Sequence, residues 1–474
     1  MKVRMDRARS GDRPRRLNRR TLLAAFASSP ILAACDTIET LARAAQFTPA
    51  VTPVPPTPVV RIGYPRIDYY YSFKTRLQTA ARDMPADRRF APDIQGISLA
   101  ISTGDNDSLD IPPPMKDVPR VYAQRAKTSA FPADLLMADP TTIGALASNG
   151  VLQDLGPLLA REGWFQTSDF TGDVLRASTH SGKLVALPLE ISVEMMWRNR
   201  PSWEMLGRKV PLSGLGWEQY LEIARRLTLG VGQRPAWGAS ITATTPSLWS
   251  LAWQQGAEIV SADGTRVSLT EGATQRVATF LGDLINRYRI APPIDGVLPS
   301  EEAHLLARAY GLGQGGPGFA RSFPANAASA GAFVGGTTWG RPMDAQLAAL
   351  PTEGRGGSLG VAPLMLGIPR TAPDVRLSLN ALRSYLDAGG TTMLTPTKKA
   401  LSNLRTDAMN LNEEEAAALR TAVETARFLP GQLPLSVLPI VQREFVVPVL
   451  RNERTPDVAA RLARPALEEI LLRV

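Results

Sequence analysis

Along most of this chain, short apolar runs alternate with longer segments in which apolar residues recur at helical spacing. The apolar runs predict strands at residues 59–65, 97–103, 133–139, 184–199, 332–340 and 360–366. Apolar residues three and four positions apart predict helices at residues 73–84, 142–159 with a glycine break, 216–228, 413–429 and 456–474. This alternation predicts an α/β fold, in which ligands bind at the carboxyl ends of the strands.

The first 34 residues have the pattern of an export signal. Residues 1–20 carry nine Lys or Arg and two Asp, and residues 21–34 are apolar or small. The apolar run is shorter than the roughly twenty residues that a membrane-spanning helix needs, so the pattern predicts a signal peptide at residues 1–34. The sequence NRRTLL at residues 18–23 also resembles a twin-arginine export signal. A buried helix with a basic lead-in is the alternative.

Cys35 is the only cysteine of the chain, so it cannot form an internal disulfide. Residues 32–35 read LAAC and resemble the lipobox of bacterial lipoproteins, in which the cysteine is lipidated and becomes the new N-terminus. The resemblance implies a lipid anchor on Cys35 at the outer face of the cytoplasmic membrane; a small buried thiol is the alternative. Residues 35–58 include a Pro/Thr-rich stretch that predicts an extended tether.

Most of the net positive charge lies in the predicted signal peptide. The chain carries a formal charge of +9, but residues 1–34, with nine basic and two acidic residues, account for +7 of it. The remaining 44 basic and 42 acidic residues leave a mature chain of +2. A nucleic-acid partner therefore loses its main electrostatic support.

Catalytic and metal-binding motifs are missing from the sequence. The two histidines, His180 and His304, stand apart from the cysteine and from any HExxH pattern, so we expect no metal site. No nucleophile elbow, Walker motif or dinucleotide fingerprint occurs, so we expect no enzyme and no cofactor. A glycoside-active enzyme is an alternative, because among 42 acidic residues some carboxylate pair always exists.

Six segments resemble, in order, the extracellular solute-binding proteins of ABC importers, specifically the family that includes sugar-binding proteins. They are ADLLMADPTTIGALASNGVLQDL (133–155), GKLVALPLEISVEMMWRNRPSWEMLG (182–207), GWEQYLEIARRLT (216–228), SLWSLAWQQGAEIVSADGTRVSL (247–269), GAFVGGTTWG (331–340) and FVVPVLRNERTPDVAARLARPALEEIL (445–471). The resemblance implies a two-lobed fold of the periplasmic-binding-protein type (type II-like), with hinge strands and a ligand cleft between the lobes.

The resemblance also implies where the lobes divide. Lobe one would comprise residues 59–188 plus 391–412, and lobe two residues 189–390 plus 413–474. Residues 187–192 and 386–394 would cross between the lobes. Pro188, Gly389 and Gly390 would form the hinge, because glycine accepts backbone changes that other residues resist.

Sugar sites combine stacked aromatic rings with carboxylates and amides. On this basis the resemblance and the strand ends imply ligand contacts from seven residues: Tyr69, Tyr70, Asp139, Glu190, Trp249, Trp339 and Gly390. Tyr71 follows the first two of these tyrosines directly. Helix capping and solvation are the alternatives for the two carboxylates, and core packing is the alternative for the tryptophans.

The resemblance implies a lipid-anchored protein that captures a small solute, with carbohydrate favoured, by hinge closure. Its partners would be that solute, the permease subunits of the ABC transporter and, through Cys35, the membrane, with no nucleic acid. A lipoprotein sensor or adhesin of the same fold is the main alternative.

Overall fold

The protein is described here by a computed structural model. It describes residues 57–67, 70–100, 113, 117–207, 209–229, 237–241, 245–261, 265–270, 272–294, 328–334, 345–352, 357–388, 394–404, 411–433 and 437–471. These residues belong to one compact unit that begins at Thr57. No helix in this part of the chain is long and apolar enough to cross a membrane.

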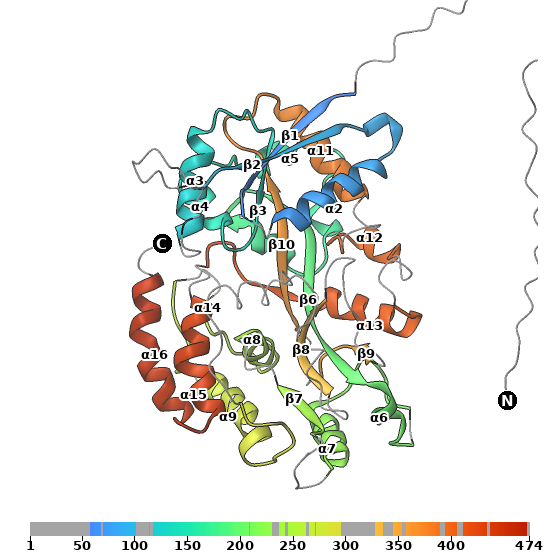
Figure 1. The fold of residues 1–474 in the computed structure, drawn as a ribbon, viewed down its shortest axis with the longest axis vertical. Helices are drawn as coiled ribbons and strands as arrows, with labels where there is room; N and C mark the ends of the chain where they lie inside the picture. The colour runs from blue at the N-terminus through green and yellow to red at the C-terminus, as the bar shows by residue number, and fades with distance from the viewer. Residues whose placement is uncertain are drawn as a thin grey trace, which may run out of the picture. The chain divides into compact units, whose positions relative to one another are not determined.

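Within the described ranges, a nine-stranded sheet forms the centre of the unit (Figure 1). Its main path runs β2-β1-β3-β10-β6-β8-β7, with β11 beside β10 and β9 beside β6. The strands are β1 Val59–Pro65, β2 Ala91–Ile97, β3 Leu135–Ala138, β6 Leu187–Asn199, β7 Ala239–Ile241, β8 Ala328–Val334, β9 Ala345–Ala348, β10 Leu359–Gly367 and β11 Arg427–Phe428. A separate hairpin joins β4 (Thr179–His180) to β5 (Lys183–Leu184).

Two long strands, β10 and β6, lie in the middle of the sheet and connect its two halves. The first half of the sheet comprises β2, β1 and β3, which pair in parallel, and the second half comprises β7, β8 and β9. The first residues of β6 pair with β10, which in turn pairs with β3, whereas the later residues of β6 pair with β8 and β9. Because β6 is buried along twelve of its thirteen residues, it forms a continuous spine between the halves.

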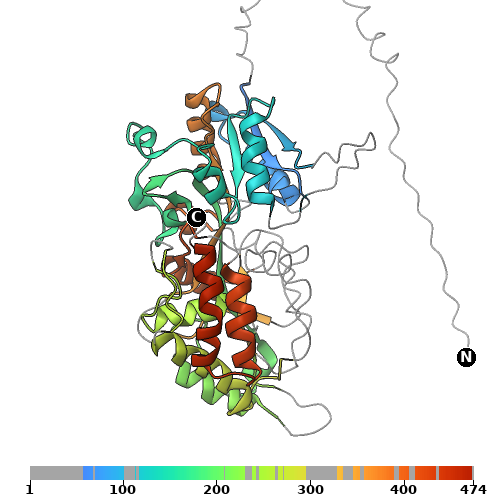
Figure 2. The same cartoon turned by 90° about the vertical axis from the view of Figure 1, so that its left-hand side faces the viewer.

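Helices cover both halves. Before β6 lie α2 Tyr71–Arg82, α3 Val118–Thr128, α4 Ile143–Ser148, α5 Gly156–Leu159 and the 3-10 turns η2 Ala86–Arg88, η4 Thr167–Asp169 and η5 Val174–Ser178, and the first two helices after β10 are α11 Val375–Ala388 and α12 Lys398–Ser402. The others are α6 Arg200–Glu204, α7 Trp217–Leu227, α8 Thr245–Gln254, α9 Gly272–Asn286, α13 Glu413–Glu424, α14 Val437–Ile440, the π-helical η8 Val441–Val446, α15 Val447–Leu450 and α16 Pro456–Leu471. Figure 2 shows α16 alongside α14 and α15, which it contacts.

Most expected elements are present, with one strand displaced. The helices predicted at 73–84 and 216–228 are α2 and α7, and the glycine break is Gly150, whose φ of +64° separates α4 from α5. The strand predicted to start at residue 97 is displaced, because β2 ends at Ile97 and residues 98–100 are not in a strand; residues 101–103 lie outside the described ranges. Parallel pairing with β1 in the register Val59 to Ala91 selects residues 91–97 instead, although they include a proline.

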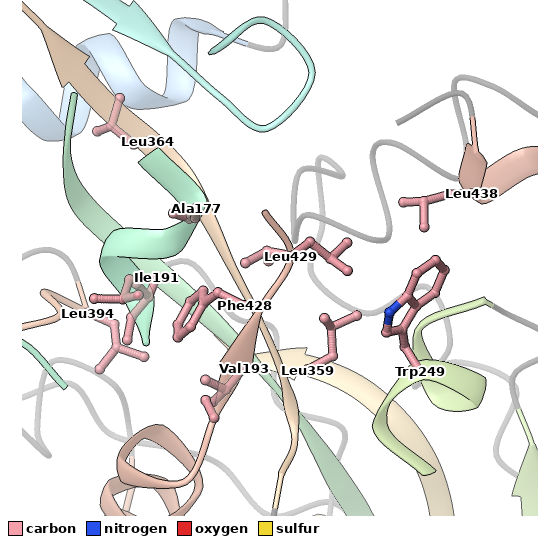
Figure 3. Close-up of a cluster of buried hydrophobic side chains, with 14 of the residues drawn as sticks. Ala177, Ile191, Val193, Trp249, Leu359, Leu364, Leu394, Phe428, Leu429 and Leu438 are labelled. Atoms are coloured by element: carbon pink, nitrogen blue, oxygen red, sulfur yellow. The ribbon is translucent and has the colours of Figure 1, made fainter. Parts of the chain in front are cut away.

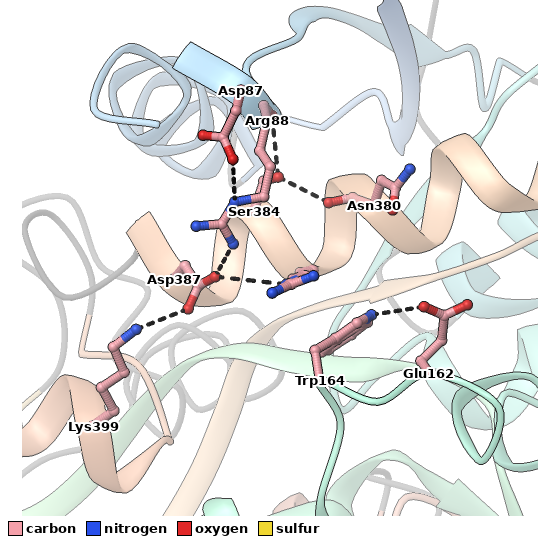
Figure 4. A network of polar contacts seen from close by, with 9 residues as sticks. Asp87, Arg88, Glu162, Trp164, Asn380, Ser384, Asp387 and Lys399 are labelled. Atoms are coloured by element: carbon pink, nitrogen blue, oxygen red, sulfur yellow. Dashed lines mark hydrogen bonds and ion pairs between the residues drawn. The ribbon is translucent and has the colours of Figure 1, made fainter. Parts of the chain in front are cut away.

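The segment expected to start the second crossing lies beside the first half of the sheet. Residues 375–388, expected in lobe two, form α11, which contacts α2 and β1. At the end of α11, the Asp387 carboxylate forms ion pairs with Arg88 of η2 and with Lys399 of α12, the latter at 3.3 Å (Figure 4). The expected crossing at 386–394 therefore begins inside this helix, and β10 is the strand that accompanies β6 through both halves.

Candidate functional site

Several residues named from the sequence lie outside the described residues. They are Cys35, Tyr69, Trp339, Gly389 and Gly390. Their roles in lipid attachment, ligand stacking and hinge bending stay predictions. Of the other expected site and hinge residues, the structure places Tyr70, Asp139, Pro188, Glu190 and Trp249.

Asp139 follows β3 at the carboxyl edge of the parallel strands, as expected. Its side chain is buried, and Oδ1 accepts hydrogen bonds from the backbone N–H groups of Thr141 and Thr142, both at 2.8 Å. The two threonine hydroxyls donate to the same oxygen at 2.6 and 2.9 Å. Burial raises the pKa of Asp139, while these hydrogen bonds act against the rise. These hydrogen bonds close the turn that leads from β3 into α4, a local role close to the helix-capping alternative that the sequence left open, although the N-cap residue of α4 itself is Thr142.

Tyr70 is fully buried, so its ring is not at the surface. Its hydroxyl lies 3.3 Å from Oγ1 of Thr142, and burial raises its pKa well above the usual value. The ring stacks on that of Tyr64, with centroids 6.3 Å apart. Tyr71, by contrast, is 47% exposed and meets the other side of this small aromatic cluster edge-on, 6.1 Å from Tyr64. Of the two tyrosines described after β1, Tyr71 is therefore the one with an exposed ring.

Trp249 lies in the hydrophobic core. It is 1% exposed, and its ring lies among apolar side chains near Leu438 and Leu359 (Figure 3). The helix that carries it, α8, packs against β10, β6 and η8, so the tryptophan side of the helix faces inward. In this structure the ring is not open to a ligand, and the core alternative fits Trp249.

Glu190 belongs to a row of polar side chains on one face of β6. Because side chains alternate along a strand, Glu190, Ser192 and Glu194 share one face, and all three are buried. The intervening Ile191 and Val193 point to the opposite face, where they lie near Phe428 and Leu394 (Figure 3). We call the row formed by Glu190, Ser192 and Glu194 the polar face of β6. Pro188, the expected hinge residue, is the second residue of the same strand and lies opposite Met365 of β10.

One end of the polar face contacts a helix of the first half. Arg76 of α2 forms an ion pair with Glu190, with Nε 2.9 Å from Oε2, and the guanidinium lies 4.5 Å from the ring centroid of Phe73. Burial raises the pKa of Glu190, whereas Arg76 lowers it.

The other end of the polar face contacts a helix of the second half. Glu194 accepts a hydrogen bond from the hydroxyl of Ser250 on α8. The same hydroxyl oxygen accepts a hydrogen bond of 2.8 Å from the backbone N–H of Leu359 at the start of β10. The polar face of β6 is thus held between α2 and α8, which belong to different halves of the sheet.

The arrangement offers charged donors and acceptors at the strand that both halves share. Sequence reasoning identified Glu190 but missed Arg76, Glu194 and Ser250. The signal for Glu194 was present, since acidic residues two positions either side of Ser192 interrupt an apolar strand on one face only. Within the described ranges, no group of three or more His, Cys, Asp or Glu could hold a metal ion.

Comparison with known proteins agrees with this fold. The family model described as bacterial extracellular solute-binding protein matches residues 118–373, more than half of the chain. The chain belongs to this family. Family membership accounts for the paired halves, because the related solved structures have two lobes with the same mixed architecture.

Three solved structures illustrate the likeness. The sugar-binding protein MalE from Xanthomonas citri has a TM-score of 0.63 at 14% identity, covering 88% of this chain and 98% of that one. A sugar transporter protein from Rhizobium etli, in an open conformation, has a TM-score of 0.62 at 12% identity, covering 88% and 99%. Maltose-bound MalE3 from T. maritima has a TM-score of 0.56 at 15% identity, covering 87% and 99%. At these identities the likeness establishes the two-lobed fold.

Proposed function

We propose that this protein is the lipid-anchored solute-binding component of an ABC importer and that its solute is a carbohydrate. The observation that carries the proposal is the polar face of β6, where Glu190 meets Arg76 of α2 and Glu194 meets Ser250 of α8. The polar face of β6 is buried in this structure, so a solute would reach it only when the two halves move apart, and helices of both halves would then border it. Such a position suits a protein that encloses its ligand between two lobes.

Carbohydrate is the favoured solute because of the chemistry near the shared strands. Sugar hydroxyls both donate and accept hydrogen bonds, and they match a set of arginine, serine and carboxylate groups. The half-exposed ring of Tyr71 offers an apolar face at the carboxyl edge of the parallel strands. Two of the similar solved structures are named as sugar-binding or maltose-bound proteins, which supports the same class.

The proposed mechanism is hinge closure. Residues Pro188, Gly389 and Gly390 would absorb the backbone change, and the ligand would contact both lobes in the closed form. A ligand that binds the closed form better shifts the population toward that form. The closed protein would then deliver the solute to the permease subunits, while a lipid on Cys35 and the tether at residues 35–58 keep it at the outer face of the cytoplasmic membrane.

An enzyme built on the polar face is disfavoured by spacing. Glycoside hydrolysis needs two carboxyl groups about 5–10 Å apart. Glu190 and Glu194 are four residues apart on one strand, so their Cα atoms lie about 13 Å apart at the usual rise per residue. Each carboxylate already contacts Arg76 or Ser250. The family matched by the chain is a family of binding proteins.

A thermal-shift screen of the chain from residue 57 onward tests the proposal. The panel contains maltose, glucose, galactose, glycerol phosphates and amino acids. A true ligand at a hundred times its dissociation constant adds about 2.7 kcal/mol of stability, which raises the melting temperature by a few degrees. We expect a sugar to give this shift and Trp339→Ala to abolish it. The control is Tyr288→Ala, which removes an aromatic ring that packs against Arg225 of α7. A folded protein that responds to no member of the panel would favour the sensor or adhesin alternative.

A further inference from the structure

Two helices of the second half, α7 and α9, end at the same place. The ring of Trp217 on α7 meets that of Phe280 on α9, with centroids 5.4 Å apart. Eight residues further along both segments, the guanidinium of Arg225 lies over the ring of Tyr288 at 4.7 Å. Equal steps along the two helices mean that they run in the same direction, so their carboxyl ends meet. Figure 1 shows both helices at the end of the unit opposite β1.

Four exposed arginines gather where these two helices end. Arg225 and Arg226 lie in the last turn of α7, and Arg287 and Arg289 follow the end of α9. Two of them pack on one ring, since the guanidinium carbons of Arg225 and Arg287 lie 4.7 and 5.5 Å from the ring centroid of Tyr288. These cation–π contacts orient the two charges. We call the four arginines together with Tyr288 the basic tip.

The basic tip carries more positive charge than its own segments balance. Residues 222–229 and 283–289 contain the four arginines and two acidic residues, Glu222 and Asp283. Asp283 forms an ion pair with Arg287 at 3.6 Å. These fifteen residues hold an excess of two positive charges, as large as that of the whole chain after residue 34. The negative ends of the helix dipoles favour cations here, but one cation at each helix end meets that need.

Exposed apolar side chains adjoin the basic tip. Nη2 of Arg226 donates to the carbonyl oxygen of Leu206 at 3.4 Å, which joins the chain after α6 to the end of α7. Met205, next to that carbonyl, is 72% exposed, and Leu229, two residues after α7, is 57% exposed. They are the two most exposed large apolar side chains among the described residues. Arginines beside exposed apolar groups and a tyrosine are typical of a surface that contacts lipid headgroups.

We propose that the basic tip, with Met205 and Leu229, is a docking surface for the anionic phospholipid headgroups of the membrane. Guanidinium groups bind phosphate through paired N–H donors, and the apolar side chains beside them enter the headgroup layer. A lipid surface is favoured over an acidic protein because of these apolar groups and because of the lipid anchor proposed at Cys35. The inference goes beyond the proposed function and does not depend on which solute is bound.

Such a contact orients the protein and does not replace its anchor. Each arginine near an anionic surface strengthens binding about fivefold, and the attraction falls off within about 8 Å at physiological salt. An extended tether of residues 35–58 would span about 70 Å, which leaves the body free to turn its basic tip toward the bilayer. A wash with about 0.5 M salt should release a chain that has no acyl group.

Flotation with lipid vesicles tests the docking surface. The protein is the chain from residue 35 with Cys35→Ala, which has no acylation site, and the vesicles are phosphatidylcholine alone or with phosphatidylglycerol. We expect binding to the anionic vesicles only, and binding at least about tenfold weaker when the salt rises from about 0.1 to about 0.5 M. Inorganic salt screens exposed charges, so this dependence follows directly from an electrostatic contact.

Three variants locate the contact. Arg225→Gln/Arg226→Gln/Arg287→Gln/Arg289→Gln should weaken binding about 100-fold, because four cations are lost. The same four positions changed to lysine should retain most of the binding, because the charge stays. Met205→Gln/Leu229→Gln should weaken binding about fivefold, because two apolar side chains no longer enter the headgroup layer.

The matched control removes four exposed arginines from other helices, α2, α3 and α16. It is Arg82→Gln/Arg120→Gln/Arg461→Gln/Arg464→Gln. The net charge changes equally, yet binding should stay within about twofold of the wild type, since the attraction is short-ranged. Circular dichroism and thermal melting verify that each variant is folded. Should the four-glutamine variant of the tip not fold, Arg287→Gln/Arg289→Gln replaces it, with an expected loss of about 25-fold.

Each other result overturns the proposal or part of it. A folded wild type that does not prefer the anionic vesicles overturns membrane docking, as does equal weakening by the tip variant and its control. Binding to polyglutamate without binding to the vesicles overturns it as well and assigns the basic tip to an acidic protein. Unchanged binding by Met205→Gln/Leu229→Gln overturns the part given to the apolar side chains. Solute binding is tested separately by the thermal-shift screen, so the two proposals fail independently.

Discussion

The ring of Tyr71 meets the ring of Tyr64 at an angle of 70°, with the two centroids 6.1 Å apart. Tyr64 in turn stacks on the fully buried Tyr70, so the exposed ring is supported by two rings of the core. Edge-to-face contacts of this kind fix the orientation of a ring and contribute about 0.5–1.5 kcal/mol beyond its buried area. Tyr71 is therefore an exposed but oriented aromatic surface.

Tyr71→Ala should weaken sugar binding about tenfold, the equivalent of about 1.4 kcal/mol, while costing little stability because half of the ring is already in water. Tyr71→Phe, which keeps the ring and loses the hydroxyl, should retain most of the affinity. Calorimetric titration with the sugar found in the screen measures both. Equal binding by Tyr71→Ala and the wild type would exclude Tyr71 from the site.

Ser250→Ala should destabilise the fold by about 1–3 kcal/mol, because a buried hydroxyl that serves two partners is removed. The variant loses the hydrogen bond to Glu194 and the one from the backbone N–H of Leu359. Urea unfolding measures the change. Ser402→Ala is the matched control, since its exposed hydroxyl bonds only to the Lys399 carbonyl among the described contacts, and it should change stability by less than about 0.5 kcal/mol. Similar losses in the two variants would contradict the prediction.

Asp139 should give the stability a dependence on pH. Burial raises its pKa in the folded state, so above the ordinary aspartate value of about 4 the folded protein holds this proton more tightly than the unfolded chain does. The contribution of Asp139 to the unfolding free energy therefore falls as the pH rises from about 4 through the raised pKa.

Asp139→Asn cannot ionise and keeps an oxygen that can accept from Thr141 and Thr142. Its unfolding free energy should gain on that of the wild type as the pH rises over this window. Urea titrations at several pH values measure the difference between the two proteins. A difference that moves in the wild type's favour with rising pH would contradict the direction of the pKa shift.

Gly360 on β10 is a position where only glycine fits. A Cβ added there would lie 2.5 to 2.8 Å from three ring atoms of Phe428, so Gly360→Ala must displace a buried ring. We expect a loss of about 1–3 kcal/mol, the usual cost of overpacking a core. Gly163→Ala is the control, because a Cβ at Gly163 meets nothing within 4 Å. Thermal melting of the two variants tests the difference, and equal melting temperatures would show that the ring adapts freely.

Cys35→Ala should release the protein from the membrane if residues 32–35 are a lipobox. The variant loses the proposed acylation site, and no described helix is long and apolar enough to replace it as an anchor. Cell fractionation and labelling with a radioactive fatty acid measure attachment. Continued membrane association of an unlabelled Cys35→Ala protein would contradict lipid anchoring through this residue.

The sequence determined the class of fold through local patterns. Helical spacing fixed α2 and α7 to within two residues at each end, and the break between α4 and α5 was visible as a glycine, Gly150, which the structure places at a positive φ. The order of six motifs pointed to the solute-binding family, whose model matches residues 118–373. Such features depend on neighbours close along the chain, which is why one sequence suffices to find them.

Tertiary structure decided which side chains meet at the shared strands. Tyr70 and Tyr71 are adjacent in sequence, yet packing against Tyr64 and Thr142 buries one and leaves the other exposed. The ion pair of Arg76 with Glu190 and the hydrogen bond of Ser250 to Glu194 each join residues more than fifty positions apart. Sequence spacing sets the face of a helix or strand on which a residue lies, but the partner of that face is selected by the packing of distant elements.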